Sequence, residues 1–529
     1  MFRTPAISYF AVIIFGGRLD ACFGQIGPYP WIAMWRLMSM TLVAILGLGV
    51  AGNVMEASWR PAEFTAPAEF SDVPLGPSVD APVLQESIDR QDVTVDIDGE
   101  AVQGLVYVPQ TGGRHPAVLF VHGAGTKDRS EFGEQAEFLA RAGIVALVLD
   151  KRETDYTPWH RDYEKMAVDV LAGVDVLRQR ADVDPSQIGL FAESEGTWVA
   201  PVAAVHDPEI AFLVMVSAPI VAPAQQATYA TLMALEGLDV PEPVKRAVAK
   251  GIGTALSLPN LLEHATFDVL PWLEQVERPI LMIYGTEDPA LPIVEGAQLV
   301  LDSAPGDVAV RYFAGAQHGI RIGDVAGPFA PGYLDTLATW IFDRESVDLP
   351  EISGGQPEQI LSAEAAPRPR WYATAYAHLV VLALAAAGYL AGPAASIVGR
   401  LRRGRRVQRI SRPLRRRLRW LRILGLASLG GLVAYFIGLS HLALNHLTSP
   451  LLTYGMWALV WIVTAGAVMA LVSLWYSDDW RPDPQFVEAS VATAARRLTR
   501  VEMIALTGAV IGTIMLLLIV TYWGVFLGI

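Results

Sequence analysis

A serine flanked by small residues is the first candidate for chemistry in this 529-residue chain. Residues 192–196 read Ala-Glu-Ser-Glu-Gly and stand between the apolar run 188–192 and a helix-like stretch that begins at Thr197. A tight strand-turn-helix elbow needs small residues two positions before and two positions after its nucleophile, because larger side chains would collide in the turn. Ala192 stands where the usual motif has glycine, which is a minor departure. We therefore predict that Ser194 is a nucleophile.

An acid and a histidine follow the serine in the order that such a nucleophile requires. Asp288 lies in YGTEDPALP after the apolar run 279–284, and His318 lies in AGAQHGI after the run 308–313. A serine hydroxyl is a weak nucleophile at neutral pH, so His318 would accept its proton and Asp288 would orient the imidazole. The chain order Ser, Asp, His, with each residue at a strand end, is that of α/β-hydrolases. The three residues are therefore the predicted catalytic triad.

Backbone N–H groups would stabilise the oxyanion that forms when the serine attacks an acyl carbon. One N–H belongs to Glu195, directly after the nucleophile. The other is expected from the HGAG run at 122–125, with Ala124 the first choice and Gly125 the second.

Two glutamates flank the serine, and their negative charge would oppose an oxyanion. We expect Glu195 to open a helix and to point outward, because the helix dipole favours an anion there. Glu193 would point back under the sheet and would then need a cation. The hypothesis is a Glu193–Arg152 pair that supports the site structurally, with Lys151 as the spare cation.

Alternating strand-like and helix-like patterns provide the elements that must position these residues. Several of the runs are continuously apolar, as strands buried on both faces are. Helical patterns at 131–143 and 166–180 supply crossovers. The fold class predicted for residues 91–345 is therefore α/β, with a doubly wound, mostly parallel sheet of eight strands that opens with a hairpin. The predicted strands are 93–98, 104–108, 117–122, 144–150, 188–192, 211–217, 279–284 and 308–313.

The run from HGAG through DKRET to DPSQIGLFAESEGTWVAPVAA resembles bacterial esterases of the α/β-hydrolase superfamily. It is most similar to the branch of dienelactone hydrolases and prolyl-oligopeptidase-like esterases, and the resemblance covers about half the chain. It implies acyl transfer to water from carboxylic esters, with thioesters and peptides as alternatives. The acyl and leaving groups stay open.

About 60 residues, 219–278, separate two of the predicted strands, which is too long for a simple crossover. They are expected to form a helical cap that excludes water and shapes the acyl pocket. Tyr156, Trp159 and His160 would either line the mouth of the same pocket or pack under a loop.

Composition limits the other possibilities. Cys22 is the only cysteine, so a disulfide within the chain, a thiolate metal cluster and a cysteine nucleophile are excluded. A net charge of −14 with no basic face on the central domain argues against nucleic acid as a partner. No cofactor and no metal are expected. A small-molecule or lipid ester is the expected substrate, membrane lipids are expected neighbours, and the oligomeric state stays open.

The N-terminal region is expected to direct the chain to a membrane. Residues 37–55 carry no charge and follow Arg36, so 34–57 is predicted to be a signal peptide or signal anchor, with cleavage and retention both open. The preceding 1–33 is interpreted as a disordered extension or as the product of a start placed too far upstream, with Met34 the better start.

Two Pro-rich or polar stretches, 58–90 and 346–370, are predicted to be linkers. After them, residues 371–529 contain four apolar segments that each exceed the roughly 20 residues needed to cross a bilayer. The expected transmembrane helices are 372–398, 423–444, 451–476 and 503–528.

Arginines set the expected orientation. The loop 400–422 contains twelve arginines and no acidic residue, and the loop before the last span carries Arg496, Arg497 and Arg500. The positive-inside rule places both loops in the cytoplasm and the central domain outside a bacterial cell membrane, and Arg36 gives the same answer. The same arginines would also attract anionic lipid headgroups.

Alternatives remain. An acyltransferase or a peptidase would use the same three residues, and the hydrolase fold would otherwise serve as a non-catalytic sensor on a functional membrane bundle. The sensor interpretation would draw on His441 and Asn445, which lie four positions apart on one predicted helix face, because polar residues within a membrane are candidates for function. Structural or interfacial roles are the simpler expectation for both, and for His378 and His446.

Overall fold

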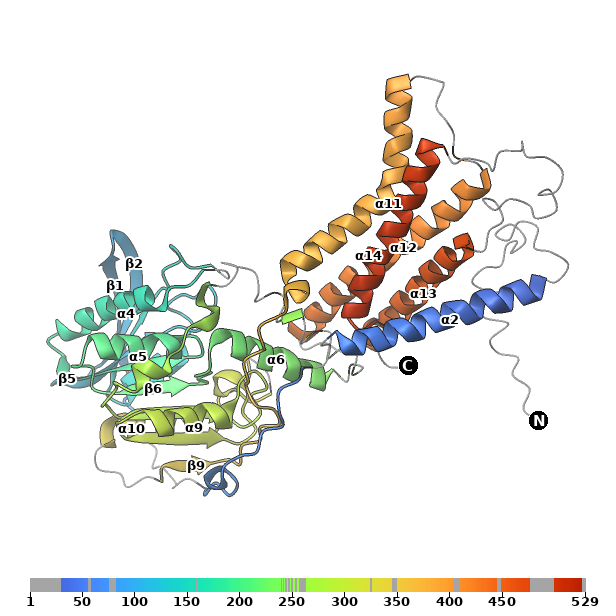
Figure 1. Ribbon diagram of the computed structural model, residues 1–529. Coiled ribbons are helices and arrows are strands. Elements are labelled where there is room, and N and C mark those ends of the chain that lie inside the picture. The colour runs from blue at the N-terminus through green and yellow to red at the C-terminus, as the bar shows by residue number, and fades with distance from the viewer. Residues whose placement is uncertain are drawn as a thin grey trace, which may run out of the picture. The chain divides into compact units, whose positions relative to one another are not determined.

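The computed structural model describes two compact units of the chain (Figure 1). One comprises Arg60–Gly237 and Ala255–Arg368, and the other comprises Met1–Trp59, Leu238–Thr254 and Pro369–Ile529. Apart from a few single positions, the described residues are 30–55, 59–75, 82–157, 160–238, 263–323, 326–344, 350–403, 412–444, 449–475 and 499–525.

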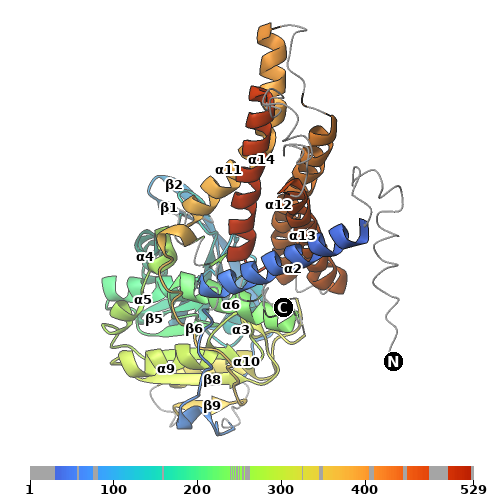
Figure 2. The same cartoon turned by 45° about the vertical axis from the view of Figure 1, so that its right-hand side comes forward.

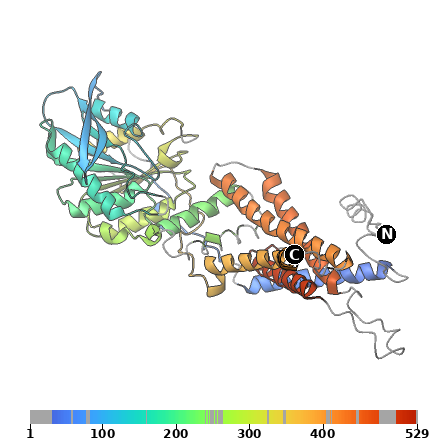
Figure 3. The same ribbon diagram turned by 90° about the horizontal axis from the view of Figure 1, so that it is seen from above.

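A single mixed sheet organises the first unit. Within the described residues it has nine strands in the order β1-β2-β4-β3-β5-β6-β7-β8-β9. β1 pairs with β2 and β2 with β4 antiparallel, and every other pair is parallel. Figure 3 shows β1 and β2 as a long ribbon at one end of the sheet. The strands are β1 (Ile88–Ile97), β2 (Glu100–Pro109), β3 (His115–Val121), β4 (Val145–Leu149), β5 (Val183–Glu193), β6 (Leu213–Val216), β7 (Ile280–Gly285), β8 (Val308–Phe313) and β9 (Ile352–Gly354).

This architecture confirms the predicted α/β class, its opening hairpin and its mostly parallel sheet. The strand count differs by one, because β9 adds to the edge beyond β8, where Val310 pairs with Ile352. β9 has three residues and lies in the stretch predicted to be a linker. Such a short segment has no periodicity of its own, and only the exposed edge of β8 makes it a strand.

Helices cover both faces of the sheet and bury two apolar cores. Buried side chains of α4 (Tyr163–Arg178), α5 (Gly196–His206) and α9 (Ile293–Ser303) share one core with the sheet. Those of α3 (Gly133–Arg141) and α10 (Tyr333–Asp343) share the other. The central strands are buried on both sides, as their unbroken apolar sequences require.

The segments that enter and leave this unit are linked to each other by hydrogen bonds. An antiparallel bridge pairs Glu63 with Leu361, and the N–H of Phe64 donates to the carbonyl of Ile360 (2.9 Å). Further along, the side chain of Gln356 accepts a hydrogen bond from the N–H of Val73 (3.2 Å). We call residues 60–75 and 350–368 the paired straps. Although their composition predicts linkers, the described residues of both lie within the folded unit.

Part of the predicted cap is described. It contains α6 (Pro223–Gly237), the short helix η3 (Glu263–Thr266) and α8 (Leu270–Leu273). Residues 243–258, which belong to the predicted cap, lie largely outside the described residues.

The second unit contains α2 (Pro30–Val54) and the long helices of the C-terminal region. Four of these are long and apolar enough to cross a membrane: Ala375–Leu401, Leu414–Leu442, Leu451–Leu474 and Arg500–Tyr522. Within the described residues they match the four long apolar helices predicted for the C-terminal region. The helices themselves are α11 (Ala375–Arg403), α12 (Arg412–Leu444), α13 (Met456–Trp475) and α14 (Arg500–Tyr522).

Glycines allow α11 and α14 to run side by side (Figure 2). A Cβ on Gly388 would lie 2.5 Å from the carbonyl oxygen of Gly508, so the two backbones meet without a side chain between them. Of the polar residues singled out in the spans, His378 packs against the rings of Tyr522 and Trp523. Asn445, His446, Arg496 and Arg497 lie outside the described residues.

Candidate active site

Ser194 occupies a strained turn between β5 and α5. Its φ is +53°, a conformation that side chains other than glycine rarely adopt. Its N–H donates to the carbonyl of Val216 on the neighbouring β6 (2.9 Å), which fixes the turn against the sheet. A Cβ on Gly196 would lie 2.5 Å from the carbonyl oxygen of Val121, so no larger residue fits there. Such strain persists only where the surrounding structure enforces it, as at functional sites.

The predicted acid and histidine are hydrogen-bonded to each other. Asp288 follows β7, His318 follows β8, and Nδ1 of His318 lies 2.8 Å from Oδ2 of Asp288. The Asp288 side chain is fully buried, and its other oxygen accepts the N–H of Ala290 (2.9 Å). Burial disfavours the imidazolium, but the charge and hydrogen bond of Asp288, assisted by Glu193, outweigh burial and raise the pKa of His318 to about 9.

Ser217 supports the histidine, a role that was not predicted from the sequence. It follows β6, is fully buried and has a φ of +48°. Its Oγ accepts the N–H of Gly319, the residue after His318, at 3.1 Å. The available signal was its place at the carboxyl end of a strand between those that carry the serine and the acid.

The HGAG loop after β3 lies directly against Ser194. A Cβ on Gly123 would be 3.3 Å from Cβ of Ser194, so this position tolerates little beyond glycine. The N–H of Gly125 donates to the hydroxyl of Tyr156 (2.9 Å) and is already used. Among the described residues, no protein acceptor takes the N–H of Ala124 or of Glu195. These two predicted donors are therefore the pair left available to an oxyanion.

Glu195 does not point outward, which corrects the expectation for its side chain. The side chain is 1% exposed, and its carboxylate accepts hydrogen bonds from Lys151 Nζ (2.8 Å), Arg161 NH1 (2.5 Å) and the Tyr156 hydroxyl (2.7 Å). Burial opposes ionisation, but the two cations outweigh it and lower the pKa of Glu195. Paired cations, and not solvent, keep this negative charge compatible with an oxyanion.

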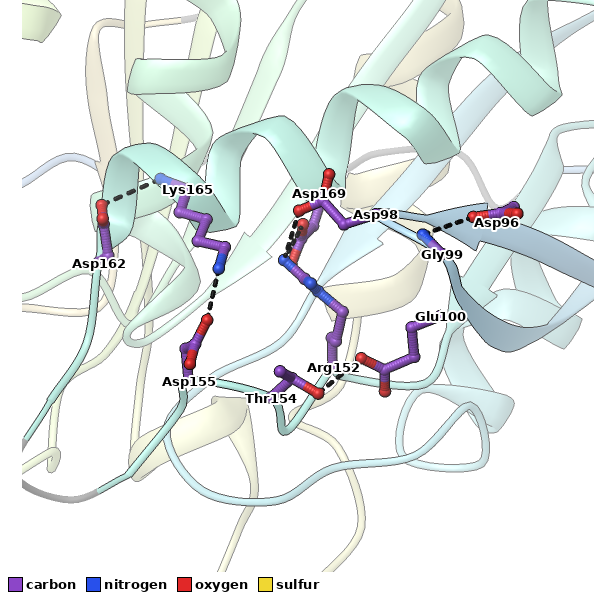
Figure 4. Close-up of polar contacts among 10 residues, drawn as sticks. All are labelled: Asp96, Asp98, Gly99, Glu100, Arg152, Thr154, Asp155, Asp162, Lys165 and Asp169. Carbon is purple, nitrogen blue, oxygen red and sulfur yellow. Dashed lines mark hydrogen bonds and ion pairs between the residues drawn. The ribbon is translucent and has the colours of Figure 1, made fainter.

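The expected Glu193–Arg152 pair is also corrected. Arg152 binds both carboxylate oxygens of Asp169 (2.9 and 2.8 Å) and approaches Asp98 at 3.4 Å (Figure 4). Lys151, the spare cation, pairs with Glu195. Lys151 and Arg152 are consecutive, yet their side chains have different partners. Lys151 reaches the HGAG loop, and Arg152 reaches α4 and the β1–β2 turn.

Glu193 has no cation partner among the described residues. Burial raises the pKa of its carboxyl, and protonated His318 opposes that rise. The carboxyl lies beside the histidine, since a Cβ on Gly319 would be 3.7 Å from Glu193 Oε1. Burial therefore disfavours the Glu193 carboxylate, and His318, not Arg152, supplies the nearby positive charge that favours it.

The other loop residues and the cap also have defined partners. The Tyr156 hydroxyl is bonded to Glu195 and Gly125, and His160 lies 2.5 Å from a carboxylate oxygen of Glu263 on η3. Trp159 lies outside the described residues. From α6, Gln226 donates to the carbonyl of Ala290 (3.1 Å), so the cap segment contacts the loop that carries the acid.

The chain is similar to several known proteins. Residues 130–327 match the prolyl oligopeptidase family. An uncharacterized protein of Mycobacterium tuberculosis is 27% identical over 283 residues, which are 52% of this chain and 86% of that protein. Esterase EstD of Thermotoga maritima is 31% identical over 126 residues, 22% of this chain and 29% of the esterase. A solved dienelactone hydrolase of Anabaena variabilis is 20% identical, covering 48% of this chain and 94% of its own, with a TM-score of 0.33. The family match confirms the predicted resemblance.

Proposed function

We propose, from the prolyl oligopeptidase family domain at residues 130–327, that the chain is a membrane-anchored serine hydrolase that cleaves carboxylic esters, thioesters included. The observation that carries the proposal is the 2.8 Å contact between His318 and a buried Asp288. Both lie at the same sheet edge as Ser194, whose positive φ is typical of a nucleophile elbow. This edge, formed by the carboxyl ends of parallel strands, is where α/β sheets bind ligands.

The proposed reaction proceeds through an acyl-enzyme. The Ser194 hydroxyl attacks the acyl carbon while His318 takes its proton, and the N–H groups of Ala124 and Glu195 stabilise the oxyanion. The ester C–O bond then breaks, and His318 returns the proton to the leaving alcohol. The same imidazole then deprotonates a water molecule, which attacks the acyl-enzyme. The bond between the acyl carbon and Ser194 Oγ breaks, His318 returns the proton to Oγ, and the acid is released. Asp288 holds the imidazole tautomer throughout.

The four apolar helices support membrane anchoring. We propose that the anchor lies in a bacterial cell membrane with the hydrolase unit outside the cytoplasm, because the twelve arginines at 400–422 favour the cytoplasmic side. A small-molecule or lipid ester is the proposed substrate, and membrane lipids are the proposed neighbours of the helices.

Labelling with a fluorophosphonate probe tests the nucleophile. The full chain in detergent is expected to react at Ser194 and to hydrolyse a chain-length series of p-nitrophenyl esters, and Ser194→Ala is expected to lose both activities. Ser186→Ala is the matched control, since Ser186 is an exposed serine on the same strand. Undiminished labelling or turnover in Ser194→Ala would contradict the proposal. Product analysis with added alcohol separates hydrolysis from acyl transfer, and a peptide panel tests the peptidase alternative.

A further inference from the structure

The buried carboxylate of Glu195 is the centre of a compact cluster beside the predicted oxyanion site. Its oxygens accept hydrogen bonds from Lys151, Tyr156 and Arg161 at 2.8, 2.7 and 2.5 Å. We call these four residues the Glu195 cluster. The proposed chemistry uses only the backbone N–H of Glu195, so the function of the buried side chain is unexplained.

Two members of the cluster extend past Glu195 to the HGAG loop. Lys151 Nζ donates to the carbonyl of Gly123 (2.6 Å), and the Tyr156 hydroxyl accepts the N–H of Gly125 (2.9 Å). Both groups also bind the carboxylate of Glu195. The cluster therefore holds the loop on either side of Ala124, the residue whose N–H is the proposed second oxyanion donor.

Packing makes this arrangement rigid. The side chains of Glu195 and Lys151 are 1% and 7% exposed, so their hydrogen bonds do not compete with bulk water. Lys151 Nζ also lies 3.9 Å from the centroid of the Tyr156 ring, a cation–π contact that restrains the ring as well as its hydroxyl. With Arg161, the cluster has two cations for one carboxylate.

We propose that the side chains of Glu195, Lys151 and Tyr156 are positioning residues that hold the two oxyanion donors at a fixed separation. Glu195 contributes one donor through its own backbone and, through its carboxylate, anchors the loop that contributes the other. This inference rests on the proposed hydrolase function and deepens it. A purely structural role of the cluster would affect stability, whereas a positioning role must weaken binding of the transition state more than binding of the substrate.

Tyr156→Phe and Glu195→Gln in the full chain test the inference, because each keeps the shape of the side chain and the backbone N–H groups. Tyr312→Phe is the matched control, since its buried hydroxyl bonds only the carbonyl of Ile293 on another part of the unit (2.9 Å). The readouts are kcat and KM for a p-nitrophenyl ester, Tm, and affinity for an alkyl trifluoromethyl ketone, whose serine adduct carries an oxyanion.

Loss of one oxyanion donor costs about 100-fold to 1,000-fold in kcat, so a loosened donor is expected to cost about 10-fold to 100-fold. Both cluster variants should lose kcat and ketone affinity by similar factors, while KM changes less than about twofold. In Tyr156→Phe, which keeps every charge, Tm should fall no further than in Tyr312→Phe. If kcat and ketone affinity in both variants stay within the range of the control, the inference is wrong although the hydrolase stands. If the wild-type chain neither labels with a fluorophosphonate nor turns over any ester, the proposed function fails and the inference fails with it.

Discussion

His318 and Asp288 form a 2.8 Å hydrogen bond in which the carboxylate is fully buried and its second oxygen is occupied by the N–H of Ala290. The carboxylate therefore has one orientation, and in the neutral imidazole it would favour a proton on Nδ1, which would leave Nε2 as the proposed base.

Asp288→Asn should leave the fold intact and lower kcat about 10,000-fold, because an amide can stabilise the wrong imidazole tautomer and cannot stabilise the imidazolium. Ester turnover and Tm measure the two effects. Asp302→Asn is the control, since Asp302 is an exposed carboxylate on α9. Full activity in Asp288→Asn would remove Asp288 from the triad.

The pH dependence of kcat/KM should follow His318. The base must be neutral, and the pKa of His318 is raised to about 9, so activity should rise from pH 7 through about pH 9 and be lost below that range. Glu193→Gln removes a carboxyl that favours the imidazolium, and the rising limb should therefore move to lower pH. Glu274→Gln, at an exposed glutamate, should leave the limb in place. A limb that moves to higher pH in Glu193→Gln would refute this assignment.

Ser217→Ala should reduce both activity and stability. The variant leaves the N–H of Gly319 without its acceptor, which costs about 1–3 kcal/mol for a buried group, and it frees the residue next to His318. We expect kcat to fall about tenfold, with the free energy of unfolding measured by denaturant titration. Thr228→Val is the control, because it deletes a buried hydroxyl on α6. Equal kcat values in the two variants would show that Ser217 does not position the histidine.

Gly196→Ala should disrupt the nucleophile turn. The new Cβ would lie 2.5 Å from the carbonyl oxygen of Val121, and this backbone atom cannot move as a flexible side chain can. We expect a loss of about 1–3 kcal/mol in the free energy of unfolding, together with most of the fluorophosphonate labelling. Gly112→Ala meets nothing within 4 Å and should change neither. A stable, fully labelled Gly196→Ala protein would contradict the tight-turn geometry.

Local patterns predicted the parts of the site that depend on local structure. Unbroken apolar runs indicated the central strands, and their ends located Ser194, Asp288 and His318 at one edge of the sheet. The positions of small residues indicated the elbow, because steric limits in a turn operate over only a few residues.

The pairing of charged side chains could not be predicted from local sequence patterns. Glu195 meets Lys151 and Arg161 across 44 and 34 positions, and Arg152 meets Asp169 on a helix face whose rotation the sequence leaves open. Among many charged residues, several pairings satisfy charge equally well, and only the packed structure selects one. β9 was missed for a related reason, since three residues become a strand only beside an unpaired edge.

The paired straps bring residue 63 beside residue 361, so the hydrolase unit starts and finishes at one place. A domain whose termini lie close together can be inserted into another protein without distortion. It can also be circularly permuted, with its termini joined and another loop opened. Circular permutants opened at the exposed turn near Gly112 should therefore keep the catalytic geometry. In evolutionary terms, the same property would allow this unit to be fused to different membrane anchors without changes to its core.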